Sequence, residues 1–169
     1  MTKNDSKHTD DELIDKLIKE QILALDIATR TGYYSIHEAG TWNFTESKHK
    51  NDNKQHKDFR DTLLKFILKY GIRRIVAEDV NVNSHFFDMR KLSEFRGILL
   101  EVCDELNLPE PEFVNVSSLK KWATNNGRAT KNEMMEACQS RFNYHPADDN
   151  EADAFLIFNY YIRKYRITT

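Results

Sequence analysis

Two apolar runs in this chain each end in an acidic residue, at a point where the surrounding pattern predicts a strand. Residues 22–25 run into Asp26, and residues 75–77 run into Glu78. Short apolar runs of this kind are typical of buried strands, and an unpaired carboxylate is costly to bury. Each acid therefore needs a charged partner, a place on the surface or an exposed strand end. For either acid alone, a salt bridge or a surface position is the simpler interpretation.

The composition fits one domain inside the cell. The chain has 169 residues, of which 40% are hydrophobic and 31% charged, and this excludes collagen-like and strongly disordered chains. We expect no membrane span, because no apolar run approaches the ~18 residues needed, and no signal peptide, because residues 1–20 are polar and acidic. Cys103 and Cys138 lack disulfide or zinc-site spacing. We expect both to be reduced core residues of a cytoplasmic protein.

Strand and helix patterns alternate along the chain. Thr130 and Glu133 have the spacing of a capping box. A turn is expected at residues 29–32 and an exposed loop at 46–57. Strands are predicted over residues 22–26, 33–36, 41–45, 73–78 and 113–116, and helices over 58–70, 89–106, 117–124, 130–142 and 149–165. This order predicts an α/β fold in which a mixed sheet carries helices on both faces.

The N-terminal part is expected to stand apart from that domain. Residues 1–20 are predicted to be an extension, and residues 21–169 a single domain. Residues 1–10 are expected to be disordered. The next residues carry a helical pattern of apolar positions, at Leu13, Ile14, Leu17 and Ile18. This short amphipathic helix could pack on the domain or on a partner chain.

The last predicted helix opens with acidic residues. Those at its start suit the positive end of the helix dipole. Asp153 is harder to explain, since it lies between two alanines and just before an apolar stretch. Asp149 and Asn150 can share its helix face, because they lie four and three residues earlier. Two strand acids and such helix oxygens can converge on Mg²⁺ or Mn²⁺, and two such ions form the usual phosphodiester-cleaving site.

The order of these features matches a known family. Asp26 on the first strand is followed by a Thr-Gly pair at residues 31–32, Glu78 lies on the fourth strand, and residues 150–154 read Asn-Glu-Ala-Asp-Ala on the last helix. Between the last two acids lie two lysines eleven residues apart, with the sequence Gly-Arg-Ala-Thr-Lys ending at the second. The chain resembles the RuvC-type Holliday junction resolvases of the ribonuclease H-like superfamily over roughly residues 22–165. Its compact form and basic early loop are more similar to phage or mobile-element relatives.

The resemblance implies a five-stranded mixed sheet and a metal-dependent active site. By position, Asp26, Glu78 and Asp153 are catalytic acids that hold two Mg²⁺ ions, with Mn²⁺ as an alternative. Asn150 stands at the fourth ligand position, where relatives usually carry Asp or His. An asparagine can offer a cation only a neutral carbonyl oxygen. Asp149, one residue earlier, could supply a carboxylate instead.

Local charge is consistent with a DNA-binding face, although the net charge is only −2. Residues 113–146 carry a net charge of +3 and residues 147–153 a net charge of −4. An acidic metal pocket beside a basic strip suits metal-dependent cleavage of a polyanion. Lys131 and Lys120 match the family's lysines near the scissile phosphate, which makes Lys131 a further catalytic candidate. The DNA-binding candidates are Lys120, Lys121, Arg128 and Lys131. The basic loop at 46–57 could add contacts, although such a charge run is more often simply solvated.

Two features of the resemblance bear on junction binding. Relatives often carry an aromatic wedge three residues after the second acid, where this chain has Asn81. Phe86 or Phe87 could replace it or could be core residues.

Relatives act as two-fold dimers, so that paired sites cut opposing strands. The predicted helix over 89–106 offers a candidate dimer face or an ordinary core face, made of Leu92, Phe95, Leu99 and Val102.

The resemblance therefore implies a metal-dependent, structure-selective endonuclease that cuts four-way or other branched DNA by paired nicks. It acts as a homodimer on DNA inside the cell, with no membrane and no small-molecule cofactor. Three alternatives stay open. One is a nuclease of the same fold with another target, such as RNA–DNA hybrids or replication forks. Another is a non-catalytic nucleic-acid-binding regulator, which Asn150 favours and the three acids oppose. The third is an interaction protein whose acids are all capped or salt-bridged.

Overall fold

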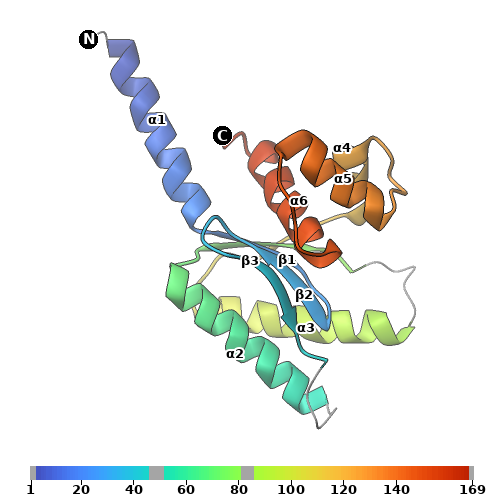
Figure 1. Ribbon diagram of the computed structural model, residues 1–169. Coiled ribbons are helices and arrows are strands. Elements are labelled where there is room, and N and C mark those ends of the chain that lie inside the picture. Colours follow the sequence, from blue (N-terminus) through green and yellow to red (C-terminus); the bar gives the residue numbers. More distant parts are fainter. Residues whose placement is uncertain (1–2, 46–51, 81–85, 168–169) are drawn as a thin grey trace.

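One five-stranded sheet organises the chain (Figure 1). The computed structural model describes residues 3–45, 52–80 and 86–167. The strand order is β3-β2-β1-β4-β5, with β1 antiparallel to β2, β2 antiparallel to β3, and both β1–β4 and β4–β5 parallel. The strands are β1 Ile22–Asp26, β2 Arg30–Tyr34, β3 Ala39–Asn43, β4 Arg74–Glu78 and β5 Glu112–Val114. The sheet is mixed, as predicted.

Helices cover both faces of the sheet, which confirms the predicted α/β architecture (Figure 1). The helices α2 (Asp52–Tyr70) and α3 (Phe86–Glu105) pack on one face, against side chains such as Leu23 and Leu25. The helices on the other face are α4 Val116–Thr124, α5 Lys131–Phe142 and α6 Asp149–Lys164. They pack against the alternate positions of the same strand, Ile22 and Ala24. This period of two is the expected side-chain alternation of a strand buried on both faces.

The second and third strands begin earlier than the sequence predicts. The turn expected at 29–32 is wrong in position, because Arg30, Thr31 and Gly32 already belong to β2. The Thr31 hydroxyl donates a hydrogen bond to the Ala28 carbonyl, which closes the turn just before the strand. Thr31 and Gly32 are therefore strand residues, and Thr31 also stabilises the preceding turn through its side chain.

Three helices also begin earlier than predicted. α2 starts at Asp52, and its added first turns carry exposed ion pairs four residues apart, Lys54–Asp58 and Lys57–Asp61. Such pairs support a helix without adding apolar positions, so apolar spacing misses them. α3 starts at Phe86, and the N-terminal helix α1 spans Lys3–Glu20 where disorder is expected over residues 1–10.

Helix α3 packs its apolar side into the core. Phe95, Leu99 and Val102 are fully buried against the sheet and α2, and Leu92 packs beside them. The core interpretation is therefore right, and this face of α3 is not available to a dimer partner. Both cysteines are free and buried, as predicted.

Some predicted features lie outside the described residues. These are the loop residues 46–51, Asn81, and the side chains of Phe86 and Phe87. None of the helices within the described ranges combines the length and the apolar content that a membrane span requires.

Candidate active site

Asp26 and Glu78 meet at one edge of the sheet. Each is the last residue of its strand, and the register pairs Leu25 with Ala77 between the parallel strands β1 and β4. The two acids therefore follow side by side, at the ~4.8 Å spacing of neighbouring strands. Alternation directs both toward the face covered by α4, α5 and α6. In open α/β sheets, the carboxyl ends of parallel strands are where ligands commonly bind.

A glycine lets helix α6 rest directly on this edge. Gly32 pairs with Asp26 in the β1–β2 register, and a Cβ added to Gly32 would overlap the backbone carbonyl of Asn150. The first turn of α6 can approach the sheet this closely only because the side chain is missing. Asp153 lies three residues farther along α6, and its carboxylate therefore reaches the acids on the strands.

The start of α6 is also fixed by a polar network. Asp148 is the N-cap residue, and its carboxylate accepts hydrogen bonds from the Glu151 backbone N–H (2.9 Å) and the Thr41 hydroxyl (2.7 Å). Arg30 pairs with the same carboxylate at 3.6 Å. Burial alone would raise the pKa of Asp148, but these partners hold it below its ordinary value. The sequence did not point to Thr41 or Arg30, because Thr41 is 107 positions from Asp148 along the chain.

The three acids form one electrostatic cluster. Burial, and then the charges of Glu78 and Asp153, raise the pKa of Asp26 well above its usual range. Burial and the charge of Asp153 raise the pKa of Glu78 to about 7. Burial raises the pKa of Asp153 to about 6, although Lys120 and Lys131 oppose the shift. The fold therefore concentrates negative charge that it neutralises only in part.

No described residue caps these acids. The hydrogen bonds and ion pairs of the described residues include none to the carboxylates of Asp26, Glu78 or Asp153, which feel their neighbours only through charge. This argues against an interaction protein whose acids are all salt-bridged or capped. A structural acid would have a partner, since an unpaired carboxylate is costly to hold in a protein interior.

Lys131 and Lys120 reach the cluster from the neighbouring helices. Lys131 is the first residue of α5, where a capping box made by Thr130 and Glu133 fixes the helix start, as predicted. Its ammonium group donates to Asp149, and this contact raises the pKa of Lys131 above its ordinary value. Lys120 on α4 is partly buried. Both lysines stabilise ionised acids, Lys120 at Glu78 and Asp153 and Lys131 at Asp26 and Asp153.

The remaining predicted site residues are less closely involved. The Asn150 side chain helps to lower the pKa of Asp148 through a hydrogen bond, so it is turned toward the N-cap. Lys121 and Arg128 are exposed. Neither is among the described groups that shift the pKa of Glu78 or Asp153.

The donor set is chemically suited to a hard divalent cation. Carboxylate oxygens are the ligands that Mg²⁺ prefers, and a cation would offset the charge that raises these pKa values. Within the described ranges, no three His, Cys, Asp or Glu side chains already stand in position to hold one ion together. Lys131 occupies the carboxylate of Asp149, so ion binding at that residue would require the ammonium group to move away.

Comparisons with known proteins identify the fold. No family model and no curated protein sequence matches the chain. RuvC from Thermus thermophilus superposes with a TM-score of 0.67 at 13% identity, over 86% of this chain and 96% of that one. RuvC of the same organism in complex with a Holliday junction substrate gives 0.66 at 15% identity, over 85% and 95%. The yeast mitochondrial Holliday junction resolvase Ydc2 gives 0.63 at 13% identity, over 93% and 86%.

Proposed function

From the RuvC-like, ribonuclease H-like fold that these comparisons show, we propose that this protein is a metal-dependent endonuclease that cuts branched DNA by paired nicks. The observation that carries the proposal is the convergence of Asp26, Glu78 and Asp153 without capping partners at one sheet edge. A binding module would gain nothing from such negative charge beside a phosphate backbone, whereas a metal-dependent nuclease requires it.

The proposed ligands are the three clustered acids together with Asp149. Two Mg²⁺ or Mn²⁺ ions held by these residues would supply an activated water for in-line attack and charge stabilisation at the leaving 3′ oxygen. The products would carry 5′-phosphate and 3′-hydroxyl ends. The backbone of Asn150 packs against Gly32, and its side-chain amide is hydrogen-bonded to Asp148. We therefore favour Asp149 over Asn150 as the fourth ligand.

Lys131 has two roles in this proposal. Without substrate, its ammonium group neutralises Asp149. A scissile phosphate would compete with Asp149 for that ammonium group. If the Lys131 side chain moved to the phosphate, it would stabilise negative charge there and leave the Asp149 carboxylate free. Lys120 would act beside Glu78 and Asp153 in the same way. Lys121 and Arg128, both exposed, would hold flanking phosphates and position the DNA.

A four-way junction is the proposed first substrate. One of the similar structures, T. thermophilus RuvC, is described in complex with a Holliday junction. Paired nicks on opposing strands require two active sites, and we therefore propose a homodimer that acts on DNA inside the cell. Lys120 on α4 and Lys131 on α5 act on the acids, so a scissile phosphate at the acids would meet both lysines.

The test is cleavage of a labelled four-way junction and a matching linear duplex, each with Mg²⁺, Mn²⁺ or EDTA. We expect paired, metal-dependent nicks on the junction only. Asp26→Asn should abolish them, and Asp104→Asn, which alters an exposed acid on α3, should not. Junction binding without cleavage in either metal would favour a regulator. Preferred cleavage of an RNA–DNA hybrid or a fork would leave the chemistry in place and change the substrate.

A further inference from the structure

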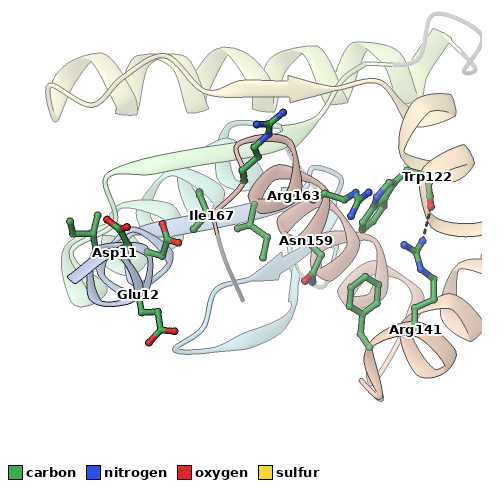
Figure 2. Close-up of a pocket in the computed structure, with 12 residues that line it drawn as sticks. Asp11, Glu12, Trp122, Arg141, Asn159, Arg163 and Ile167 are labelled. Carbon is green, nitrogen blue, oxygen red and sulfur yellow. Dashed lines mark hydrogen bonds between the residues drawn. The ribbon is translucent and has the colours of Figure 1, made fainter. Parts of the chain in front are cut away.

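Arginines lie near both ends of helix α6, and their surroundings differ. At the C-terminal end, Arg163 and Arg166 line a groove of about 1050 Å³ whose other wall, on α1, carries acidic residues (Figure 2). In the same groove, the guanidinium group of Arg141 already donates to the Trp122 carbonyl at 2.6 Å. α6 has 16 residues and is therefore about 24 Å long, so this end of the helix is distant from the acids at the sheet edge. Arg30 on β2 lies at the other end, next to the N-cap of α6.

Arg30 lies at the same edge of the sheet as the acids. β2 runs antiparallel to β1 and Gly32 pairs with Asp26, so Arg30 lies beyond the end of β1, roughly 6–7 Å along β2 from the position opposite Asp26. Alternation places Arg30 on the same face as Gly32, which is the face that α6 covers. Because β2 and β4 lie on opposite sides of β1, Arg30 and Glu78 flank Asp26 from opposite sides.

The contacts of Arg30 hold it near this edge and leave it accessible. Its guanidinium group lies 3.6 Å from the Asp148 carboxylate, which is too long for a hydrogen bond, and its side chain is 54% exposed. Asp148 does not depend on this pair, because it also accepts hydrogen bonds from the Thr41 hydroxyl and the Glu151 backbone N–H. Exposed ion pairs contribute little to the stability of a fold. Arg30 can therefore exchange Asp148 for a phosphate at little cost.

The charges around the acids indicate which phosphate Arg30 would meet. Lys120 and Lys131 act directly on the acids, and a scissile phosphate there would meet them. Arg30 is not among the described groups that shift the pKa of any of the three clustered acids. It therefore suits a neighbouring phosphate, since a strand whose scissile phosphate lies at the acids carries further phosphates on either side.

We propose that Arg30 binds a backbone phosphate of the DNA strand that is cut, next to the scissile phosphate and on the β2 side of the acids. A planar guanidinium group can hold two phosphate oxygens at once, so this contact fixes the direction of the strand as well as its position. The strand then crosses the site from β2 toward α4, between Arg30 and Lys120. This assignment rests on the proposed function, since the scissile phosphate is taken to lie at the three acids.

The test is the salt dependence of binding to a four-way junction, measured by fluorescence anisotropy in EDTA so that no strand is cut. Arg30→Ala should weaken binding roughly fivefold to tenfold at 0.1 M salt and reduce the slope of log affinity against log salt by about 1. Arg30→Lys should keep the slope, because it keeps the charge. Arg74→Ala is the matched control. Arg74 also begins a strand and is exposed, but β4 runs parallel to β1, so it lies at the opposite end of the sheet.

A purely structural role of Arg30, through Asp148, would give a different result. Thr41→Val removes the closer partner of Asp148, at 2.7 Å, but it removes no charge. It should lower the thermal stability more than Arg30→Ala does and leave the slope unchanged. A slope that Arg30→Ala leaves unchanged, or that Arg74→Ala reduces equally, would overturn the assignment.

Neutral methylphosphonates, placed one at a time around the cleavage site, locate the contact. One of them, next to the scissile phosphate, should weaken junction binding by the wild type and have little further effect on Arg30→Ala, since both changes remove the same contact. Equal weakening of both proteins at every position would overturn the assignment.

The Arg30 contact and the proposed nuclease activity can fail separately. Junction cleavage by a wild type whose salt slope does not depend on Arg30 would overturn the Arg30 contact alone. Binding without cleavage in Mg²⁺ or Mn²⁺ would overturn the nuclease, and a slope reduced by Arg30→Ala would still support Arg30 as a DNA contact. A wild type that does not bind the junction would overturn both.

Discussion

At the residue scale, the acids at the sheet edge are stabilised in their protonated form. Burial is the main cause of the raised pKa values of Asp26, Glu78 and Asp153, and mutual repulsion adds to it at Asp26 and Glu78. The folded chain thus holds charge that lowers its own stability until a cation or a proton arrives. That is the expected property of acids whose use is in function rather than in the fold.

The variant Asp26→Asn distinguishes a functional acid from one that stabilises the fold. Removing the charge should lower junction cleavage by roughly 10²–10³-fold or more. It should also raise the free energy of unfolding in EDTA by on the order of 1 kcal/mol, because a neutral side chain avoids the cost of burying a charge. Urea unfolding and single-turnover cleavage measure the two effects. Asp104→Asn should change neither. A loss of stability with unchanged cleavage would indicate a structural acid.

The same acids predict how stability depends on pH. With a pKa of about 7 at Glu78 and about 6 at Asp153, the native state binds more protons than the unfolded chain between roughly pH 4 and 7. The free energy of unfolding therefore decreases as the pH rises through that range. Groups whose pKa is lowered, such as Glu38 and Asp148, act in the opposite sense but finish titrating below about pH 5.

The melting temperature in EDTA should accordingly fall by roughly 3–8 °C between pH 5 and pH 8. Mg²⁺ should restore part of it at pH 8, since a cation favours the ionised acids. Glu78→Gln should flatten the profile. A melting temperature that rises with pH in EDTA, or that ignores Mg²⁺, would show that the acids do not share one environment.

At the scale of elements, the site depends on how closely α6 approaches the sheet. Gly32→Ala should force the first turn of α6 away from β2, because the new Cβ would overlap the Asn150 backbone. We expect a loss of about 2–3 kcal/mol in the free energy of unfolding and a larger loss of cleavage than of DNA binding. Gly97→Ala is the matched control, since its Cβ would meet nothing within 4 Å inside helix α3. It should stabilise the protein by about 0.5–1 kcal/mol. Equal effects of the two changes would contradict this role of Gly32.

The sequence predicts those elements whose signals are local. The run ending in Asp26 is β1 with the predicted bounds, and the Thr130–Glu133 capping box marks the start of α5. The predicted position of the strand that contains Gly32 is wrong, because this glycine is needed for the close approach of α6 and not for a turn. The partners of Asp148 could not be predicted, since Thr41 and Arg30 meet it only after the chain has folded.

At the scale of the whole molecule, the proposed site lies on one side of the sheet. The acids Asp26, Glu78 and Asp153 and the lysines Lys120 and Lys131 lie on the side of the sheet that α4, α5 and α6 cover. The helices α2 and α3 cover the opposite face (Figure 1). The arm formed by α1 leaves at the side and exposes its own apolar stripe. The proposed DNA-binding surface and the exposed side chains of α1 therefore belong to different parts of the domain.

Loss of a basic residue should weaken DNA binding only on the side of the sheet that carries the proposed site. Lys121→Ala and Arg128→Ala should each weaken junction binding at all salt concentrations and reduce the slope of log affinity against log salt by about 1, because each removes one phosphate contact. Lys57→Ala on α2, an exposed lysine of the opposite face, should leave the slope unchanged. Fluorescence anisotropy measures the slopes. Equal losses on both faces would indicate unspecific attraction instead of a defined DNA surface.

The most direct test of the proposed metal site is to locate Mn²⁺ by anomalous scattering in a crystal of the protein grown with that ion. We expect Mn²⁺ at the carboxyl ends of β1 and β4, within about 2.5 Å of carboxylate oxygens of Asp26, Glu78 and Asp153, with Lys131 displaced from Asp149. Mn²⁺ bound elsewhere, or an ordered crystal in which the three acids stay ion-free at saturating Mn²⁺, would contradict it.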